Sequence, residues 1–467
     1  MSAHPSHSRP CRRKPTRAVL AIATVVGLGL FLPTTAWAAR SEFFGIAQQA
    51  LDGKDINGIA AARIRTVRMQ LDWDRIEPSQ GSFDWTPANH LVGVLASHGI
   101  RTVPFVWGSP NWVASSPATP PLDSPAHEQA WRDFLTAAVA RYGPGGTYWA
   151  NGYREKYGAG ATPLPVGTWQ IWNEPNLEHF WAPGPQPRRY AKLVRISHDP
   201  IEGQDPNARI LLAGMPGKAW EFLDTFYSVR GIKSDFDAAA LHPYGSDLSE
   251  VRYSIQSVRH VMVNHGDAAT PLWLTEFAWG SAPPDRFGIN QGLTGQARML
   301  KRSYELILDH RSEWRIGRLF WYHWRDPLDP EATCSFCSSA GLLRSNRSAK
   351  PALTPFKGFT TDTTPPVAHF ISPPTPTEGS VINDPTPKFK FDSTDPAYPG
   401  ATYQCHVDAN SFKTCRSPFT TAPLSDGAHS FSVKAIDPAG NESAVVTRAF
   451  MVDSHAPVAS QVRGRTG

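Results

Sequence analysis

The feature that most constrains the fold of this chain is a regular alternation of strand-like and helix-like stretches between residues 43 and 322. Eight short apolar runs are separated by stretches whose apolar residues recur at helical spacing. The runs cover residues 43–46, 66–69, 102–107, 169–172, 209–215, 236–241, 272–275 and 319–322. Eight strands alternating with helices over roughly 320 residues predict an α/β fold, the (β/α)₈ or TIM barrel. A doubly wound open sheet is the alternative, but its Gly-x-Gly-x-x-Gly motif is absent after the first run.

Residues 1–38 have the pattern of a secretory signal peptide. Five basic residues precede an apolar run over 18–32, and Ala36-Trp37-Ala38 has the A-x-A form of a cleavage site. The run is short for a membrane span, and an uncleaved anchor is the alternative. We therefore expect a secreted protein that is cleaved near Ala38. The five basic residues account for the whole formal charge of +5, so the rest of the chain is neutral and nucleic acid is not an expected partner.

The composition changes after residue 360. Pro, Thr, Ser and Asp dominate as far as residue 400, and short runs of period-two alternation appear at 388–391 and 431–435. Turn-forming residues separate these runs, as at 437–441. This pattern predicts a small all-β sandwich of roughly ninety residues. We expect the signal peptide at 1–38, the barrel at 39–360, the sandwich with its Pro/Thr-rich linker at 361–453 and a tail at 454–467.

Four cysteines follow the signal segment, an even number that is typical of disulfides in a secreted chain. Their spacing predicts two local disulfides, Cys334–Cys337 and Cys405–Cys415, the second of which would close a predicted hairpin. Cys334-x-x-Cys337 could also be half of a zinc site. No second Cys pair or His-x-x-x-His accompanies it, so no metal and no other cofactor is expected.

Two glutamates occupy equivalent places at the ends of two predicted strands. The run 169–172 ends in Asn173-Glu174-Pro175, and the run 272–275 ends in Glu276. The carboxyl ends of barrel strands meet at one rim, so we expect the two carboxyl groups to face each other. Such a pair suits glycoside hydrolysis. One carboxyl group protonates the leaving oxygen, and the other, ionised, attacks the anomeric carbon or activates water.

Plainer interpretations of these acidic residues are available. A glutamate after an apolar strand can stand in the first turn of a helix, where the helix dipole favours it. That alternative weakens when both glutamates, Asn173 and several aromatic residues all fall at strand ends. Asp72 and Asp74 also follow a predicted strand, and for them we expect the structural role of a helix cap or salt-bridge partner.

The residues at the strand ends resemble a known family. Trp172-Asn173-Glu174-Pro175 together with Glu276 resembles the retaining glycoside hydrolases with a (β/α)₈ barrel, of clan A type, and is similar to families 5 and 39. The resemblance covers about residues 41–360 and includes Arg68, Ser109-Pro110-Asn111-Trp112, His242-Pro243-Tyr244 and Phe320-Trp321-Tyr322-His323-Trp324.

The resemblance implies a role for each matching position. Glu174 is the expected acid/base and Glu276 the expected nucleophile. Asn173 is expected to hold the 2-hydroxyl of the sugar, and Arg68 to keep Glu276 ionised. The other expected substrate-binding residues are His242, Tyr244, Trp107, Trp321 and Trp324. Trp321 or Trp324 is the expected platform under the sugar, although plain core packing is the alternative for each and their phase along the strand is ambiguous.

The end of the chain resembles bacterial immunoglobulin-like modules, through Tyr403-Gln404-Cys405-His406-Val407-Asp408 and the segment 426–431. Such modules are spacers or contact glycans and cell surfaces, and spacer is our expectation here. The whole resemblance implies a monomeric hydrolase of β-linked oligo- or polysaccharides. A catalytically silent carbohydrate-binding or cell-surface protein and a transglycosidase are the alternatives. We expect the sugar and linkage to depend on loops, especially 143–167 and 280–291.

Overall fold

The computed structural model describes residues 42–48, 50–329, 334–395 and 400–455. The predicted signal segment, and all but the first two residues of the predicted tail, lie outside the described residues. Across the described ranges, no helix is both long enough and apolar enough to cross a membrane.

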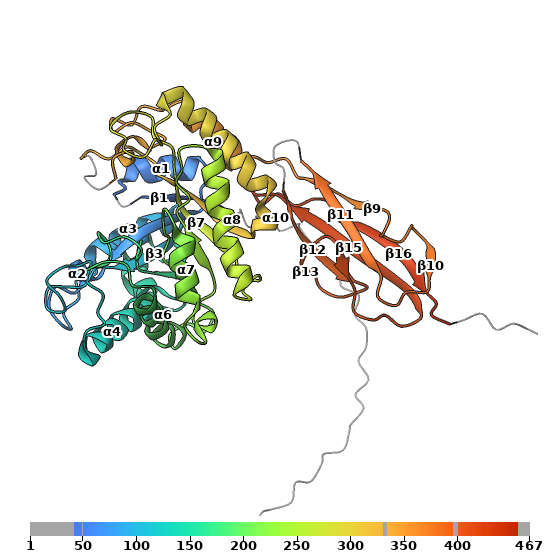
Figure 1. The fold of residues 1–467 in the computed structure, drawn as a ribbon, viewed down its shortest axis with the longest axis horizontal. Helices are drawn as coiled ribbons and strands as arrows, with labels where there is room; N and C mark the ends of the chain where they lie inside the picture. Colours follow the sequence, from blue (N-terminus) through green and yellow to red (C-terminus); the bar gives the residue numbers. More distant parts are fainter. Residues whose placement is uncertain (1–41, 49, 330–333, 396–399, 456–467) are drawn as a thin grey trace, which may run out of the picture. The chain divides into compact units, whose positions relative to one another are not determined.

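Eight parallel strands form a barrel-like sheet, which confirms the predicted (β/α)₈ fold (Figure 1). The strand order is β5-β4-β3-β2-β1-β8-β7-β6. A parallel bridge between Leu211 and Ala238 brings the two end strands, β5 and β6, together. The strands are β1 (Phe44–Ala47), β2 (Thr66–Asp72), β3 (Arg101–Trp107), β4 (Thr168–Ile171), β5 (Arg209–Leu212), β6 (Ala239–Leu241), β7 (Leu272–Phe277) and β8 (Ile316–Tyr322).

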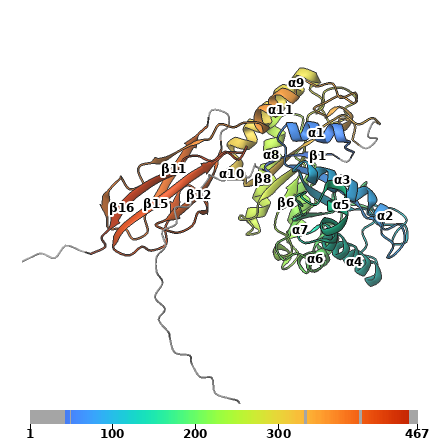
Figure 2. The ribbon, with the colours of Figure 1, turned by 180° about the vertical axis from the view of Figure 1, so that it is seen from behind.

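Helices follow every strand and lie on the outside of the barrel (Figures 1 and 2). The main ones are α1 (Gly53–Ala61), α3 (Thr86–Ser97), α4 (Pro125–Tyr142), α6 (Pro187–Glu202), α7 (Ala219–Tyr227), α8 (Leu248–Asn264), α9 (Gly292–Asp309) and α11 (Leu353–Thr360). Short helices α2 (Trp73–Ile76), α5 (Arg154–Tyr157) and α10 (Arg311–Trp314) add to them. Side chains cap several helix starts; Asp52, for example, accepts hydrogen bonds from the Lys54 and Asp55 backbone amides at α1.

The core of the barrel explains why the strands are apolar runs without alternation. Both faces of a parallel strand are covered, one by the barrel interior and one by the helices. The largest fully buried side chains include ten of the sixteen tryptophans of the chain. Core packing therefore accounts for most of the tryptophan content, and few indoles remain free to contact a ligand.

The segment 143–167 joins α4 to β4 and therefore enters the barrel at the amino-terminal end of a strand. Its aromatic side chains Tyr148, Trp149 and Tyr153 are buried against one another, with ring centroids 5.1–6.0 Å apart. The expectation that this segment governs substrate choice is wrong, because loops that line a barrel mouth leave the carboxyl ends of strands.

The C-terminal part forms two β-sheets around a separate core, which confirms the predicted sandwich and is consistent with an immunoglobulin-like domain. One sheet has the order β10-β16-β15-β12-β13 and the other β14-β11-β9. Phe389 stacks on Phe431 between the sheets, with centroids 4.2 Å apart. The strands are β9 (Val367–Ile371), β10 (Ser380–Ile382), β11 (Lys388–Thr394), β12 (Thr402–Val407), β13 (Lys413–Cys415), β14 (Phe419–Thr420), β15 (Gly427–Ile436) and β16 (Val446–Val452).

Both predicted disulfides are present. Cys405 of β12 and Cys415 of β13 join paired strands, with Cα atoms 5.9 Å apart. Cys334 and Cys337 close a short loop after β8, with Cα atoms 5.3 Å apart.

Candidate active site

The end of β4 bends sharply and places two polar side chains at the mouth of the barrel. Trp172 and Glu174 have positive φ angles of 71° and 41°, which are uncommon for residues with a side chain. The backbone amide of Glu174 donates to the Gly214 carbonyl at 3.1 Å, which fixes the turn against β5. Pro175 then prevents the strand from continuing. Strained backbone of this kind is concentrated at functional sites.

Glu276 lies near the end of β7, and Thr275 precedes it. The next helix, α9, begins only at Gly292, and the helix after Glu174 begins only at Pro187. Neither glutamate therefore stands in the first turn of a helix, and the alternative based on the helix dipole is wrong.

Arg68 joins the two glutamate-bearing strands from the inside of the barrel. It lies on β2, is almost fully buried and donates three hydrogen bonds in three directions. Nη1 donates to Glu276 Oε1 at 2.6 Å and Nη2 to Asn173 Oδ1 at 2.7 Å. Nε donates to Gln170 Oε1 at 2.6 Å. The planar guanidinium thus orients Asn173 and Glu276 with one rigid group.

Tyr244 and His242 reach the glutamates from the end of β6. The Tyr244 hydroxyl donates to Glu276 Oε2 at 2.8 Å. His242 Nδ1 lies 2.7 Å from Glu174 Oε1 and 3.6 Å from Glu276 Oε2, while its Nε2 lies 3.0 Å from the Thr275 hydroxyl. One imidazole therefore lies against both carboxyl groups.

Burial decides the protonation state of both aromatic residues. It lowers the pKa of His242 well below its ordinary value, and the Arg68 charge lowers it further. Burial also raises the pKa of Tyr244 well above its ordinary value, and the neighbouring Glu276 charge adds to this effect. At neutral pH His242 is an uncharged imidazole and Tyr244 an uncharged phenol, so each can donate a hydrogen bond to a carboxylate.

The two glutamates are close together and nearly buried, each 8% exposed. An oxygen of Glu174, a ring nitrogen of His242 and an oxygen of Glu276 all lie within 4.8 Å of one another. Gly214 makes room for this packing, because a Cβ there would stand 2.0 Å from His242 Nε2. The chain thus brings together two carboxyl groups that are far apart in the sequence.

Three residues of this network were not expected from the sequence. Gln170 is fully buried and links Arg68 to the Leu212 carbonyl, to which its Nε2 donates at 2.9 Å. Thr275 contacts His242 as described. Tyr322 lies close enough to Tyr244 for the two phenols to interact. A polar residue inside an apolar strand is the signal that points to Gln170.

The two tryptophans expected as a sugar platform lie elsewhere. Trp321 is 0% exposed, packs on Phe277 and Tyr304, and donates to the Ala340 carbonyl. Trp324 is 2% exposed and packs against Gly58 of α1. A sugar platform needs an open ring face, so the expectation for both residues is wrong and their packing is that of core residues.

Trp107 is half-buried at the end of β3. Its ring lies 6.1 Å from that of Trp172 and 5.8 Å from that of Phe180. Trp107 therefore stands at the carboxyl ends of the strands, next to the residue that precedes Asn173.

The structure separates the roles of Asp72 and Asp74. Asp72 stands at the start of α2 but makes no capping hydrogen bond with its side chain. Its carboxylate instead accepts from the Gln70 amide. Asp72 is therefore not a helix cap, but its carboxylate pairs with Arg75 at 3.9 Å, so the other expected role, that of a salt-bridge partner, is confirmed. Asp74 lies inside α2, where one carboxylate oxygen faces the backbone near Gly108.

Three clusters of acidic residues and histidine have the spacing of a metal site. One is Glu174, His242 and Glu276; the other two, in the C-terminal part, are Asp362, Asp395 and Asp437, and Asp426, Asp453 and His455. In the first cluster the Arg68 guanidinium already neutralises Glu276 at 2.6 Å, which makes that position unfavourable for a cation.

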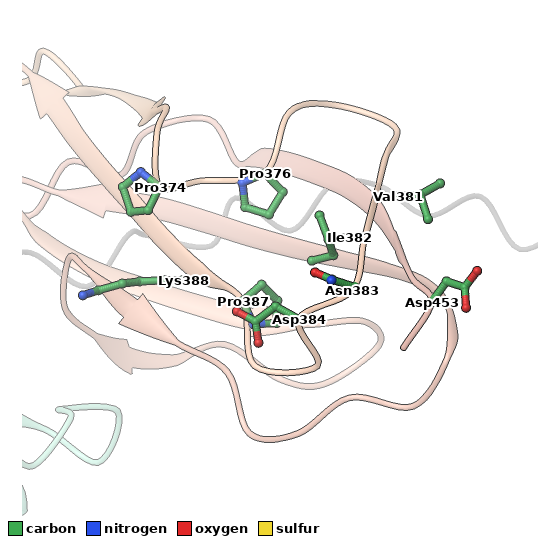
Figure 3. Close-up of a pocket in the computed structure, with 9 residues that line it drawn as sticks. All are labelled: Pro374, Pro376, Val381, Ile382, Asn383, Asp384, Pro387, Lys388 and Asp453. Carbon is green, nitrogen blue, oxygen red and sulfur yellow. The ribbon is translucent and has the colours of Figure 1, made fainter. Parts of the chain in front are cut away.

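A pocket of about 570 Å³ lies on the β-sandwich (Figure 3). Its lining residues are Pro374, Pro376, Val381, Ile382, Asn383, Asp384, Pro387, Lys388 and Asp453. None of these nine side chains is aromatic. The lining therefore lacks the flat rings on which sugars usually stack, and the pocket does not favour glycan binding over a spacer role.

A barrel whose mouth holds two adjacent carboxyl groups, an arginine and an amide has the catalytic arrangement of a glycoside hydrolase. Comparison with protein families agrees: residues 168–349 match the family model described as "Glycosyl hydrolase catalytic core". That range includes both glutamates. The resemblance to glycoside hydrolases with a (β/α)₈ barrel is thus confirmed.

Curated relatives match a shorter stretch. Endo-1,4-beta-xylanase A of Fusarium oxysporum f. sp. lycopersici is 28% identical over 120 residues, which are 24% of this chain and 36% of the relative. Endo-1,4-beta-xylanase 1 of Gibberella zeae is 29% identical over 120 residues, 24% of this chain and 33% of the relative. The matched stretch therefore spans about a third of each of these relatives.

Solved structures share the fold at low sequence identity. A family 39 glycoside hydrolase from Bacteroides cellulosilyticus WH2 has a TM-score of 0.53 and 15% identity, over 89% of this chain and 81% of the other. A monomeric beta-xylosidase from Caulobacter crescentus CB15 has a TM-score of 0.53 and 16% identity, over 85% and 84%. At these identities the likeness is one of fold.

Proposed function

We propose that this protein is a secreted glycosidase that hydrolyses β-linked oligo- or polysaccharides with retention of configuration at the anomeric carbon. The observation that carries the proposal is the pair Glu174 and Glu276, with oxygens within 4.8 Å of each other. Retaining enzymes hold their two carboxyl groups about 5–5.5 Å apart, whereas inverting enzymes need about 6.5–9.5 Å to admit a water molecule.

In the first step Glu276 is the nucleophile. Its carboxylate oxygen bonds to the anomeric carbon while the bond from that carbon to the leaving oxygen breaks, and Glu174 gives its proton to the leaving oxygen. Hydrogen bonds that Glu276 accepts from Arg68 and Tyr244 favour the ionised form that this step requires.

In the second step Glu174 is the base. It takes a proton from water, the water oxygen bonds to the anomeric carbon, and the bond to Glu276 breaks. Neutral His242 supports this step, since its Nδ1–H donates to ionised Glu174 while Nε2 accepts from the Thr275 hydroxyl. Asn173, which Arg68 orients, is positioned to bind the 2-hydroxyl of the sugar.

The names of the relatives suggest where to look for substrates. β-1,4-Xylan and aryl β-xylosides are the first compounds to test, followed by other aryl β-glycosides. Export from the cell is supported by the signal pattern of residues 1–38, and amino-terminal sequencing of the secreted protein should find Ala39 first.

The test is the Glu276→Ala variant. We expect it to lose at least about 10⁴-fold in kcat on an aryl β-glycoside, because no group remains to attack the anomeric carbon. Added azide should restore part of the turnover by attacking in place of the carboxylate, and should leave a glycosyl azide of inverted configuration.

Two measurements bear on the rest of the proposal. NMR of the first product formed by the wild-type protein should show the β-anomer, and an α-anomer would rule out retention. Product analysis with added acceptor sugars separates hydrolysis from transglycosylation, because a transglycosidase would form longer oligosaccharides as its main products. Full activity of Glu276→Ala would remove Glu276 from the mechanism.

A further inference from the structure

Strand β2 carries more than Arg68 on its inner face. Successive side chains of a strand alternate between its two faces, so Arg68, Gln70 and Asp72 share one face. The contacts of Arg68 with Asn173 and Glu276 show that this face points into the barrel. At about 3.3 Å per residue, Gln70 and Asp72 follow at about 7 and 13 Å along the strand, toward its carboxyl end.

The structural contacts of Asp72 are weak. It does not cap α2, and its salt bridge with Arg75 is long, at 3.9 Å, and joins it to a side chain that is 80% exposed. Its close partner is the neutral amide of Gln70. Burial raises the pKa of Asp72, so folding places this carboxyl group where solvation is poor. Partly desolvating a carboxylate whose ionic partner is distant and exposed costs stability, and such a cost is typical of functional groups.

Trp107 stands beside Asp72 on the next strand. The two residues are register partners in the pairing of β2 with β3, and neighbouring strands are about 4.8 Å apart. Phe105, two residues earlier, lies under the Arg68 guanidinium at 4.2 Å, so Trp107 shares the inner face. Its indole nitrogen is buried, and among the described residues it has no hydrogen-bond partner. The indole nitrogens of Trp169, Trp181, Trp314 and Trp324 share this property, but those four side chains are buried, and of the five only Trp107 is half-exposed at the end of a strand.

We propose that Gln70, Asp72 and Trp107 form a subsite that binds sugar hydroxyl groups away from the bond that is cleaved, and that this subsite sets which sugar is accepted. The proposal rests on the proposed function, because it presupposes a sugar between the two glutamates. The Asp72 carboxylate accepts from hydroxyl groups, the Trp107 N–H donates to one, and the Gln70 amide holds the carboxylate in place.

This arrangement predicts strong discrimination. A site built to hydrogen-bond a hydroxyl group rejects a ligand that lacks it, because the polar groups of the protein are then buried without partners. Each such group is worth about 10- to 100-fold in kcat/KM for a charged acceptor. The Asp72 subsite therefore affects the choice between sugars that differ at one hydroxyl group, whereas Glu174 and Glu276 act on every sugar that reaches them.

The experiment compares the wild-type protein with Asp72→Asn on the best aryl β-glycoside and on its monodeoxy analogues. We expect Asp72→Asn to lose about 10- to 100-fold in kcat/KM on the parent sugar. On the one analogue that lacks the bound hydroxyl group, kcat/KM of Asp72→Asn should be less than about threefold below that of the wild-type protein. Trp107→Phe keeps an aromatic ring and removes the N–H. It should reduce the ratio of kcat/KM between the parent sugar and the analogue that lacks the bound hydroxyl group.

Asp74→Asn is the matched control, since Asp74 is a nearby carboxyl group whose pKa is also raised by burial. It lies on α2 rather than on the inner face, so it should change the melting temperature and leave the ratios between sugars unaltered. An equal loss on every sugar in Asp72→Asn, or no loss on any, would overturn the subsite even if Glu276→Ala is inactive as expected.

A binding measurement keeps the two proposals separate. Calorimetric titration of Glu276→Ala with the parent oligosaccharide needs no turnover, and adding Asp72→Asn to that variant should weaken binding about tenfold or more. Unchanged binding in this arm would also overturn the subsite. Absence of turnover by the wild-type protein, with binding that still depends on Asp72, would instead overturn the hydrolase proposal alone.

Discussion

At the scale of single residues, His242 is a titratable side chain held away from water between Glu174 and Thr275. Its folded-state pKa lies below the ordinary value of about 6.5, so the unfolded chain takes up a proton first as the pH falls. The contribution of neutral His242 to the free energy of unfolding is therefore fully present above about pH 6.5 and is lost progressively below it.

The consequence can be measured by calorimetry at pH 7.5 and 5.0. The His242→Gln variant should be less stable than the wild-type protein at pH 7.5, because its contacts are lost. Between pH 7.5 and 5.0 the melting temperature of this variant should fall less than that of the wild-type protein. The difference should be a few degrees, since about 1 kcal/mol shifts the melting temperature of a large domain by about 2–4 °C. Parallel losses in both proteins would contradict the assignment.

His429 of the sandwich provides a control of opposite sign. A hydrogen bond to Asp408 raises its pKa, so its stabilising effect is present at low pH and is lost as the pH rises through the folded-state value. His429→Gln should therefore destabilise the sandwich more at pH 5.0 than at pH 7.5.

The sequence indicated the residues that meet at the barrel mouth better than the residues that hold them. Glu174, Glu276 and Tyr244 stand at or just after strand ends, where position alone indicates their place in a barrel. Gln170 and Thr275 stand inside apolar runs, and only their contacts across the barrel show their purpose. For Asp72 the expected cap is absent and the expected salt bridge is present, because the Gln70 amide rather than the start of α2 takes its carboxylate.

At the scale of elements, the loop closed by Cys334–Cys337 supports Glu276, the proposed nucleophile, through an intervening side chain. Phe336, between the two cysteines, packs edge-on against Tyr244 with centroids 4.9 Å apart. Tyr244 in turn donates to Glu276. The disulfide therefore helps to hold Phe336, which packs on Tyr244, and Tyr244 contacts the proposed nucleophile Glu276.

Replacing both Cys334 and Cys337 with serine should lower kcat/KM by about three- to tenfold, because Tyr244 loses a rigid neighbour. The loss of stability should be smaller than in the control variant below. The matched control replaces Cys405 and Cys415 with serine. That pair lies in the sandwich, where loss of a disulfide costs about 2–5 kcal/mol of stability, and kcat/KM should stay unchanged. Equal kinetic effects of the two double variants would refute the role of the first loop.

The phase of a strand is harder to predict than its existence. The predicted run 319–322 lies within β8, but it carries aromatic residues on both faces, so the sequence alone could not decide which faces inward. The structure turns Trp321 toward the helices, against Tyr304 of α9, and leaves the inner face to its neighbour. Aromatic residues fit both faces of a barrel strand, and only packing separates them.

At the scale of the whole molecule, the barrel and the sandwich have separate hydrophobic cores and separate sheets. The eightfold alternation predicted the first and the period-two runs predicted the second, because each pattern follows from the geometry of its own fold. All the residues proposed for chemistry lie between Arg68 and Glu276, inside the barrel.

A chain that ends at Thr361 should therefore keep kcat/KM on a soluble aryl β-glycoside within about threefold of the full chain, because domains with their own core work alone. The comparison uses residues 39–361 and 39–467, with circular dichroism to verify folding. A folded short chain with more than tenfold lower kcat/KM would show that the sandwich contributes to the active site.

The hydrogen bonds around Arg68 occupy the interior of the barrel, a place that barrels usually fill with branched apolar side chains. Exchanging a buried ionic group for well-packed apolar residues is often neutral or stabilising. In a laboratory evolution experiment that selects for heat resistance alone, these positions should thus change toward leucine and methionine. The selected variants would be thermostable but inactive. A thermostable variant that keeps its activity therefore requires selection for turnover in every round.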